Sequence, residues 1–107
     1  MSKTIPAGTP MPTPVPPGRF AEYAACLAEG FCPSCRQPVT WARVLIPGLN
    51  YADCSRCRCS WEYDRNVIGG PMIRWRGVAD ADGTKDGIAW DIWTRDDRVF
   101  GNAEWAE

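Results

Sequence analysis

The sequence predicts a small α+β domain, with one short helix near the N-terminus and antiparallel β-strands after it. Three observations support this fold class. Apolar residues recur at helical spacing between residues 19 and 30, strand-like segments separated by turn residues follow, and two C-x2-C pairs lie between them. The 107 residues leave room for one small core, and chains of this size often depend on a covalent staple or a metal.

The composition excludes several classes of protein. Hydrophobic residues make up 45% of the chain, which is too much for wholesale disorder, and no apolar run approaches the roughly 18 residues that span a bilayer. The chain has no histidine, so it contains no Ser-His or Cys-His catalytic pair and no histidine metal ligand. The first residues lack the apolar core and the cleavage site of a secretory signal. We therefore expect a cytoplasmic protein without a membrane partner, whose cysteines stay reduced.

The N-terminal part divides into a tail and a helix. Residues 1–18 contain six of the ten prolines, within residues 5–18, which predicts a disordered Pro-rich tail. Residues 19–30 predict the helix, because four apolar side chains fall on one face and Gly30 can end it. These side chains are Phe20, Tyr23, Ala24 and Leu27.

Residues 19–107 are expected to form a single domain in which strands follow the helix. The predicted strands are Thr40–Ile46, Leu49–Asp53, Ser60–Ile68, Met72–Val78 and Ile88–Thr94. Pro47-Gly48 is expected to turn the chain between the first two. The last two predict a β-hairpin with an acidic loop, within an acidic, tryptophan-bearing segment 71–107.

The cysteines form the most specific motif. Cys32 and Cys35 make one C-x2-C pair, Cys54 and Cys57 make a second, and eighteen residues separate the pairs. This spacing is typical of a four-thiolate zinc site, because each tight turn brings two sulfurs to one side, within reach of a single ion. Four protein ligands leave no position for water, so the predicted Zn²⁺ is structural.

The arrangement over about residues 31–65 resembles a zinc ribbon, the rubredoxin-like class with two zinc knuckles on antiparallel strands, and we assign the predicted ribbon to residues 31–70. That class usually has glycine after the second cysteine of each knuckle, where the backbone is left-handed. Arg36 and Arg58 occupy these positions here. Either the backbone is less left-handed than in the family, or each site stores roughly 1 kcal/mol of strain.

Alternatives to this ligand set remain open at the level of sequence. In an extended strand Cys59 points to the same side as Cys57, and it would replace Cys57 as a ligand. Iron suits the same four sulfurs, and a disulfide framework or a redox-active C-x-x-C is a further alternative. Cys26 lies on the predicted helix and is most simply a buried apolar residue.

The charge is unevenly distributed, although the net charge is only −1. Residues 30–78 carry seven arginines against three carboxylates, whereas residues 79–107 carry three basic groups against eight carboxylates. The acidic segment either neutralises the basic one or forms an interaction surface. Binding to a partner or nucleic acid is predicted for two sets of residues. They are Arg56, Arg58, Arg74 and Arg76 in the basic segment, and Trp93 and Trp105 in the acidic one.

No catalytic motif and no small-molecule substrate site is evident, so the prediction is a binding protein that is not an enzyme. We expect a small adaptor or inhibitor that docks on a protein or a protein–nucleic-acid complex, and its size and charge would suit a phage or mobile-element protein. The resemblance to zinc ribbons implies a transcription-associated setting. The alternative is direct DNA or RNA binding through the arginine-rich ribbon.

Overall fold

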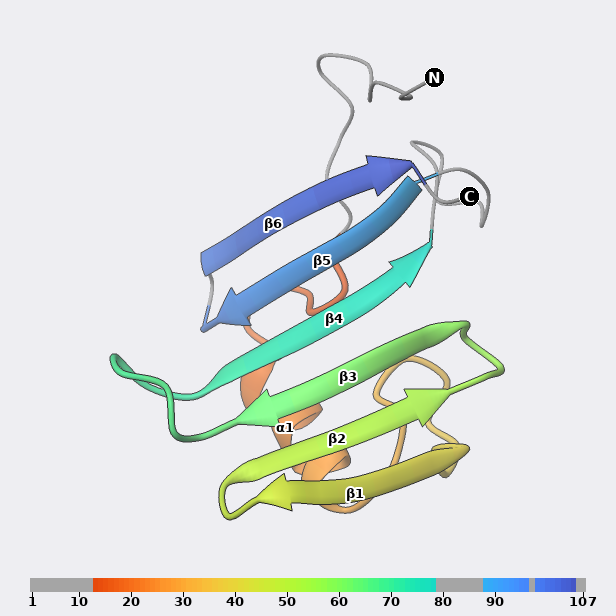
Figure 1. Cartoon of the computed structure of the whole chain (residues 1–107). Helices are drawn as coiled ribbons and strands as arrows, with labels where there is room; N and C mark the ends of the chain where they lie inside the picture. Colours follow the sequence, from red (N-terminus) through yellow and green to blue (C-terminus); the bar gives the residue numbers. More distant parts are fainter. Residues whose placement is uncertain (1–12, 79–87, 97, 106–107) are drawn as a thin grey trace.

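The computed structural model describes residues 13–78, 88–96 and 98–105, and over these residues it has one helix and one six-stranded antiparallel sheet (Figure 1). The α+β class is therefore confirmed. The elements are α1 (Phe20–Ala28), β1 (Trp41–Ile46), β2 (Leu49–Cys54), β3 (Cys59–Asp64), β4 (Met72–Val78), β5 (Ile88–Arg95) and β6 (Arg98–Trp105). The strands lie side by side in the order in which they occur along the chain.

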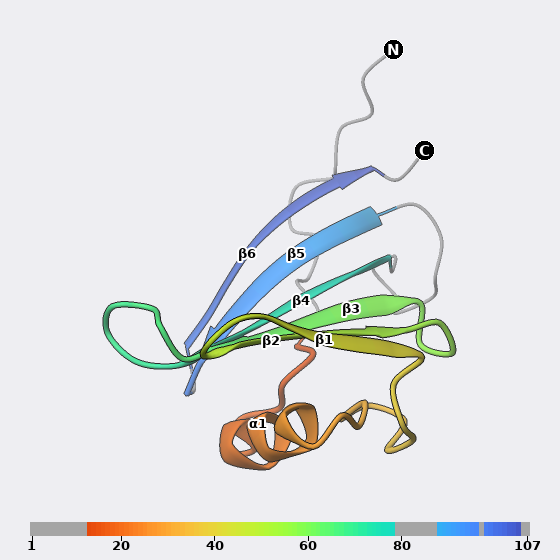
Figure 2. The same cartoon turned by 60° about the horizontal axis from the view of Figure 1, so that its bottom comes forward.

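Helix α1 lies against one face of the sheet, over β2 and β3 (Figure 2). It buries Tyr23, Ala24 and Leu27, three of the four side chains that the helical spacing predicted, and the fourth, Phe20, is partly buried against the same core. Tyr23 packs edge-on against Trp61 of β3, with 6.0 Å between ring centroids. Gly30, with a φ of 83°, takes the left-handed conformation that ends the helix.

Local turn chemistry sets the strand boundaries. Gly48 has a φ of 90° in the Pro-Gly turn between β1 and β2, as the sequence predicted. Strand β3 ends at Asp64, earlier than the predicted Ile68, because the Asp64 side chain accepts a hydrogen bond from the Asn66 amide and turns the chain.

The predicted pairing of β4 with β5 is confirmed, but the prediction stopped one strand short. Strand β6 pairs with β5 through a tight turn in which Asp96 has a φ of 50°. Residues 98–105 are not among the predicted strands, and they include Gly101 and Asn102, which are poor strand formers. Pairing with β5 outweighs that local preference. The predicted acidic loop of residues 79–87 lies outside the described residues.

The core lies between α1 and the sheet. Trp61 and Ile73 are almost fully buried there, and the cross-strand register places Trp61 opposite Trp75. Val15 also belongs to this core, with only 2% of its surface exposed. The chain therefore packs before Gly18, where the sequence analysis ended the tail, since an extended Pro-rich segment can still bury one apolar side chain. Residues 1–12 lie outside the described residues.

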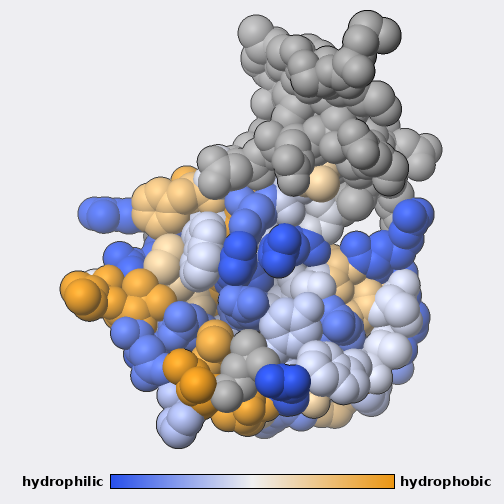
Figure 3. Space-filling model, in the orientation of Figure 1, coloured by the Kyte–Doolittle hydropathy of each residue, from blue (hydrophilic) through white to orange (hydrophobic). Residues whose placement is uncertain are grey.

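The opposite face of the sheet has no helix over it in the described part of the chain, and it is predominantly polar (Figure 3). At its centre the Arg74 guanidinium donates two hydrogen bonds to Asp91, at 2.8 and 2.6 Å, and lies 4.9 Å from the ring centroid of Trp93. We call this surface the open face. Among the described residues, no helix is both long and apolar enough to cross a membrane.

Candidate metal centre

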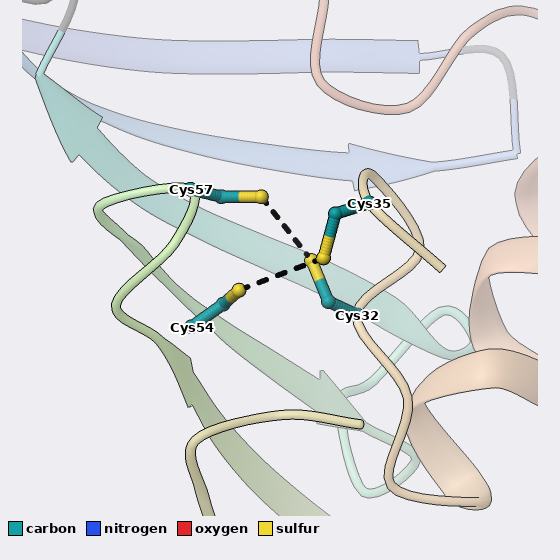
Figure 4. Close-up of side chains that lie close together, drawn as sticks. All are labelled: Cys32, Cys35, Cys54 and Cys57. Atoms are coloured by element: carbon teal, nitrogen blue, oxygen red, sulfur yellow. Dashed lines mark hydrogen bonds between the residues drawn. The ribbon is translucent and has the colours of Figure 1, made fainter. Parts of the chain in front are cut away.

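Four cysteine sulfurs converge at one end of the sheet (Figure 4). Cys32 and Cys35 come from the loop after α1, Cys54 is the last residue of β2, and Cys57 lies in the connection between β2 and β3. All four sulfurs lie within 4.8 Å of one another. Two separate parts of the chain therefore meet at one point, which explains how a short domain can link its helix region to its sheet.

The two cysteine segments have the same local structure, offset by 22 residues. In the first cysteine turn, residues 31–38, Phe31 pairs with Pro38 and the Cys32 amide donates to the Gln37 carbonyl. In the second cysteine turn, residues 53–60, Asp53 pairs with Ser60 and Cys54 with Cys59. Each turn thus presents its two sulfurs from the tip of a tight antiparallel loop.

Both turns require a left-handed residue after their second cysteine. Arg36 has a φ of 62° and Arg58 a φ of 55°. The sequence left open whether the backbone here is less left-handed than in zinc ribbons or is left-handed and strained. The structure has the left-handed backbone, and each arginine carries a steric cost of about 1–2 kcal/mol that glycine would avoid. Both turns adopt the left-handed backbone despite this steric cost, which indicates that the positions of the cysteine sulfurs are important to the fold or to its function.

Backbone amides point at the sulfurs and favour the charged thiolate. The amides of Ser34 and Cys35 donate to the Cys32 sulfur, and the Gln37 amide donates to the Cys35 sulfur. The pKa of Cys32 falls to about 4, through a hydrogen bond from the Cys59 thiol first and these amides second. The pKa of Cys35 is lowered too, chiefly by the Gln37 amide.

The second turn behaves in the opposite way. Burial raises the pKa of Cys57 to about 12 and also raises the pKa of Cys54. Proximity to the Cys32 and Cys35 sulfurs adds to both effects, whereas the amide and thiol of Cys57 lower the pKa of Cys54. A nearby cation would favour the thiolate form of both thiols.

The spacing of the sulfurs fits a tetrahedral metal ion. Four thiolates at about 2.3 Å from one ion lie about 3.8 Å apart. The Cys32–Cys57 sulfurs are 3.7 Å apart and the Cys35–Cys54 sulfurs are 3.8 Å apart. The four predicted ligands are thus brought together, and they could hold one metal ion.

Cys59 does not belong to this group of four. It lies at the start of β3, paired with Cys54, and only 8% of its surface is exposed. Its pKa is raised, because its thiol interacts with Cys32 and because it is buried. The geometry therefore places Cys57, not Cys59, beside the other three sulfurs.

The four arginines predicted to bind a partner fall into two pairs. Arg56 donates hydrogen bonds to the Cys35 sulfur and to the Pro38 carbonyl, and Arg74 is held by Asp91. In contrast, Arg58 and Arg76 line an open hollow of about 470 Å³ together with Trp41, and in the described part of the chain neither makes an ion pair within 4.0 Å. Arg56 and Arg74 are thus already engaged within the domain.

The two tryptophans predicted to bind a partner, Trp93 and Trp105, are described to different extents. Trp93 is half-buried on the open face, opposite Phe100 of β6 and beneath Arg74. Trp105 ends β6, and its side chain lies outside what the structure describes. Sequence reasoning missed a third group, the exposed apolar side chains Trp41, Val44 and Ile46 of β1. The strand pattern gave no sign of them because it does not tell an edge strand from a central one.

Comparison with protein-family models, with curated proteins and with solved structures found no match. The geometry of the cysteine turns is therefore the main guide to function.

Proposed function

We propose that this chain is a zinc-ribbon module in which one structural Zn²⁺, bound by Cys32, Cys35, Cys54 and Cys57, organises a domain that works by docking on another protein. The observation that carries the proposal is the match between the sulfur spacing and a tetrahedral thiolate site. The four sulfurs saturate the ion, leaving no position for a substrate or a reactive water, so its role is structural rather than catalytic.

Metal analysis tests the first part. Protein purified without added metal should contain one zinc per chain by mass spectrometry, and Co²⁺ replacement should give the visible absorption of a tetrahedral four-thiolate centre. The double variant C35S/C54S provides the control, because it should bind neither zinc nor Co²⁺. Iron in place of zinc would overturn the identity of the ion, and metal-free protein with a dispersed NMR spectrum would overturn the site.

The open face supports the second part of the proposal, an adaptor or inhibitor role. Trp93, Phe100 and the Arg74–Asp91 pair lie there together, and tryptophan and arginine are frequent at the centres of protein interfaces. Partner capture from native lysate should return one dominant protein, and Trp93→Ala should weaken its recovery. Ile68→Ala is the matched control, because Ile68 is 95% exposed in the connection between β3 and β4. Equal recovery by both variants would contradict a docking role for Trp93.

The hollow lined by Arg58, Arg76 and Trp41 supports a second candidate function, direct nucleic-acid binding. Guanidinium groups neutralise phosphates and an indole can stack on a base. A labelled single-stranded oligonucleotide should then bind at low salt and dissociate steeply as salt rises, and Arg58→Glu should abolish binding. Arg56→Gln controls for effects at the metal centre. Binding that is absent at low salt would exclude this function.

A further inference from the structure

Strand β1 lies at one edge of the sheet (Figure 1), and in the described part of the chain no strand pairs with its outer side. Three of the six large apolar side chains that are exposed among the described residues belong to it: Trp41 is 47% exposed, Val44 61% and Ile46 54%. An edge strand offers unpaired backbone donors and acceptors, and natural proteins usually protect such an edge with charges or proline. This edge carries one charge, Arg43.

A groove runs beside this edge, between the C-terminal end of α1 and the sheet. Figure 2 shows α1 beneath β1 and β2. The groove has a volume of about 280 Å³. Glu29, Gly30, Arg43, Asn50 and Tyr51 line it together with apolar groups from both sides. The apolar groups include Leu27 and Ala28 of α1, and Ala42 and Val44 of β1. A strand placed along β1 would therefore have a helix on one side of it.

The register of β1 shows what such a strand would meet on each face. Ala42 pairs with Ala52, which is buried beneath α1, so Ala42 and Val44 belong to the groove side. Arg43 pairs with Tyr51 on the open face, and its guanidinium lies 5.8 Å from the Trp41 ring centroid. No carboxylate in the described part of the chain forms an ion pair with Arg43. The groove side of the edge thus presents the apolar side chains of Ala42 and Val44, and the opposite side presents the positive charge of Arg43.

We propose that β1 and the α1–β1 groove bind an extended segment of the partner protein as an additional strand, in which apolar residues alternate with acidic ones. The inference rests on the proposed docking function and names the chemistry of the partner. Alternate side chains of a strand point to opposite faces, so the apolar residues enter the groove beside Val44 and the acidic residues lie beside Arg43. Backbone hydrogen bonds to β1 supply affinity, and the two faces supply specificity.

A second copy of this chain fits the edge less well. Symmetric antiparallel pairing centred on Arg43 would place two like charges directly opposite each other, which is destabilising. The charge at Arg43 therefore favours an acidic segment from another protein.

The test uses the metal-loaded full chain and a fluorescein-labelled nonapeptide in which valine and glutamate alternate. Fluorescence anisotropy should show about tenfold tighter binding of this peptide than of one alternating valine and lysine. Arg43→Glu should reverse that preference. Val44→Lys should weaken binding about tenfold, whereas Ile68→Lys, a matched change at an exposed apolar residue, should have no effect.

Two further measurements test the mode of binding. NMR amide shifts on titration should concentrate in Trp41–Ile46 and at the end of α1, and N-methylation of alternate peptide residues should abolish binding when it removes the donors that face β1. Equal binding of both peptides, shifts confined to the open face, or a stable dimer of the free chain in sedimentation would overturn the proposal. Metal-loaded protein that does not bind the peptide but still captures its partner through Trp93 would refute the β1 inference and leave the docking function standing. Failure to bind metal instead refutes the proposed function.

Discussion

Replacing Arg58 with glycine should stabilise the protein, although it removes a charge beside the metal centre. Arg58 has a φ of 55°. A residue with a side chain loses about 1–2 kcal/mol in this left-handed conformation, while glycine avoids that cost. Glycine also gives the unfolded chain more freedom, which costs about 0.5–1 kcal/mol. The difference predicts a net gain of about 0.5–1 kcal/mol for Arg58→Gly.

The assay is urea unfolding of metal-loaded protein at a fixed free metal concentration, followed by tryptophan fluorescence. Thermal unfolding should show a parallel rise in Tm of about 2–6 °C. Arg58→Ala is the essential control, because it removes the same side chain but keeps the backbone cost. It should give no gain in the free energy of unfolding.

Arg36→Gly provides a second comparison at the equivalent position of the first cysteine turn. Arg36 has a similar φ of 62°, but its guanidinium also pairs with Glu22 of α1. The glycine variant there should therefore gain less than Arg58→Gly. If Arg58→Gly is no more stable than Arg58→Ala, the left-handed backbone is not a source of strain and the reasoning is refuted.

Four other changes test the core, the metal centre and the open face. Cys54→Ser should lose a metal contribution on the order of 10 kcal/mol and give a poorly dispersed NMR spectrum even with added zinc; a dispersed spectrum would contradict this. Trp61→Ala should lower the free energy of unfolding by about 3–5 kcal/mol, because Trp61 is 1% exposed, and a loss below 1 kcal/mol in urea unfolding would count against its place in the core. Val15→Ala should cost about 1.5 kcal/mol in the same assay, whereas an unpacked tail would give no change. Hydrogen bonds from Arg74 lower the pKa of Asp91. The stability that this pair contributes is therefore present above about pH 4 and is lost as the pH falls below that value. Asp91→Asn should flatten this part of a curve of unfolding free energy against pH, and an unchanged curve would argue against the pair.

The cluster of four cysteines could be predicted because its geometry is largely local. A C-x2-C turn fixes the relative position of its two sulfurs whatever surrounds it, and only the meeting of the two turns depends on the fold. The choice between Cys57 and Cys59 was not open to the same reasoning. An extended chain would point both sulfurs to one side, but the left-handed Arg58 turns the chain between them, and Cys59 enters β3 opposite Cys54.

The surface residues were harder to predict, since their partners come from neighbouring strands. Arg74 and Arg76 look equivalent in sequence, yet Arg74 is held by Asp91 of β5 while Arg76 lines the hollow. Similarly, the exposure of Val44 follows from the position of β1 at the sheet edge, which only the topology reveals. Local pattern thus predicts most of the strands, with β6 as the exception, and the register decides what their side chains contact.

The strands occupy the sheet in the order of the chain, so every pairing joins consecutive elements. All four sulfurs precede β3, and the contacts of α1 are with β2 and β3. During synthesis on the ribosome, the four cysteines can therefore come together while β4, β5 and β6 are still unmade, and each later strand then pairs with the one before it. The proposed metal-bound end would thus form first, and the sheet would extend from it one strand at a time.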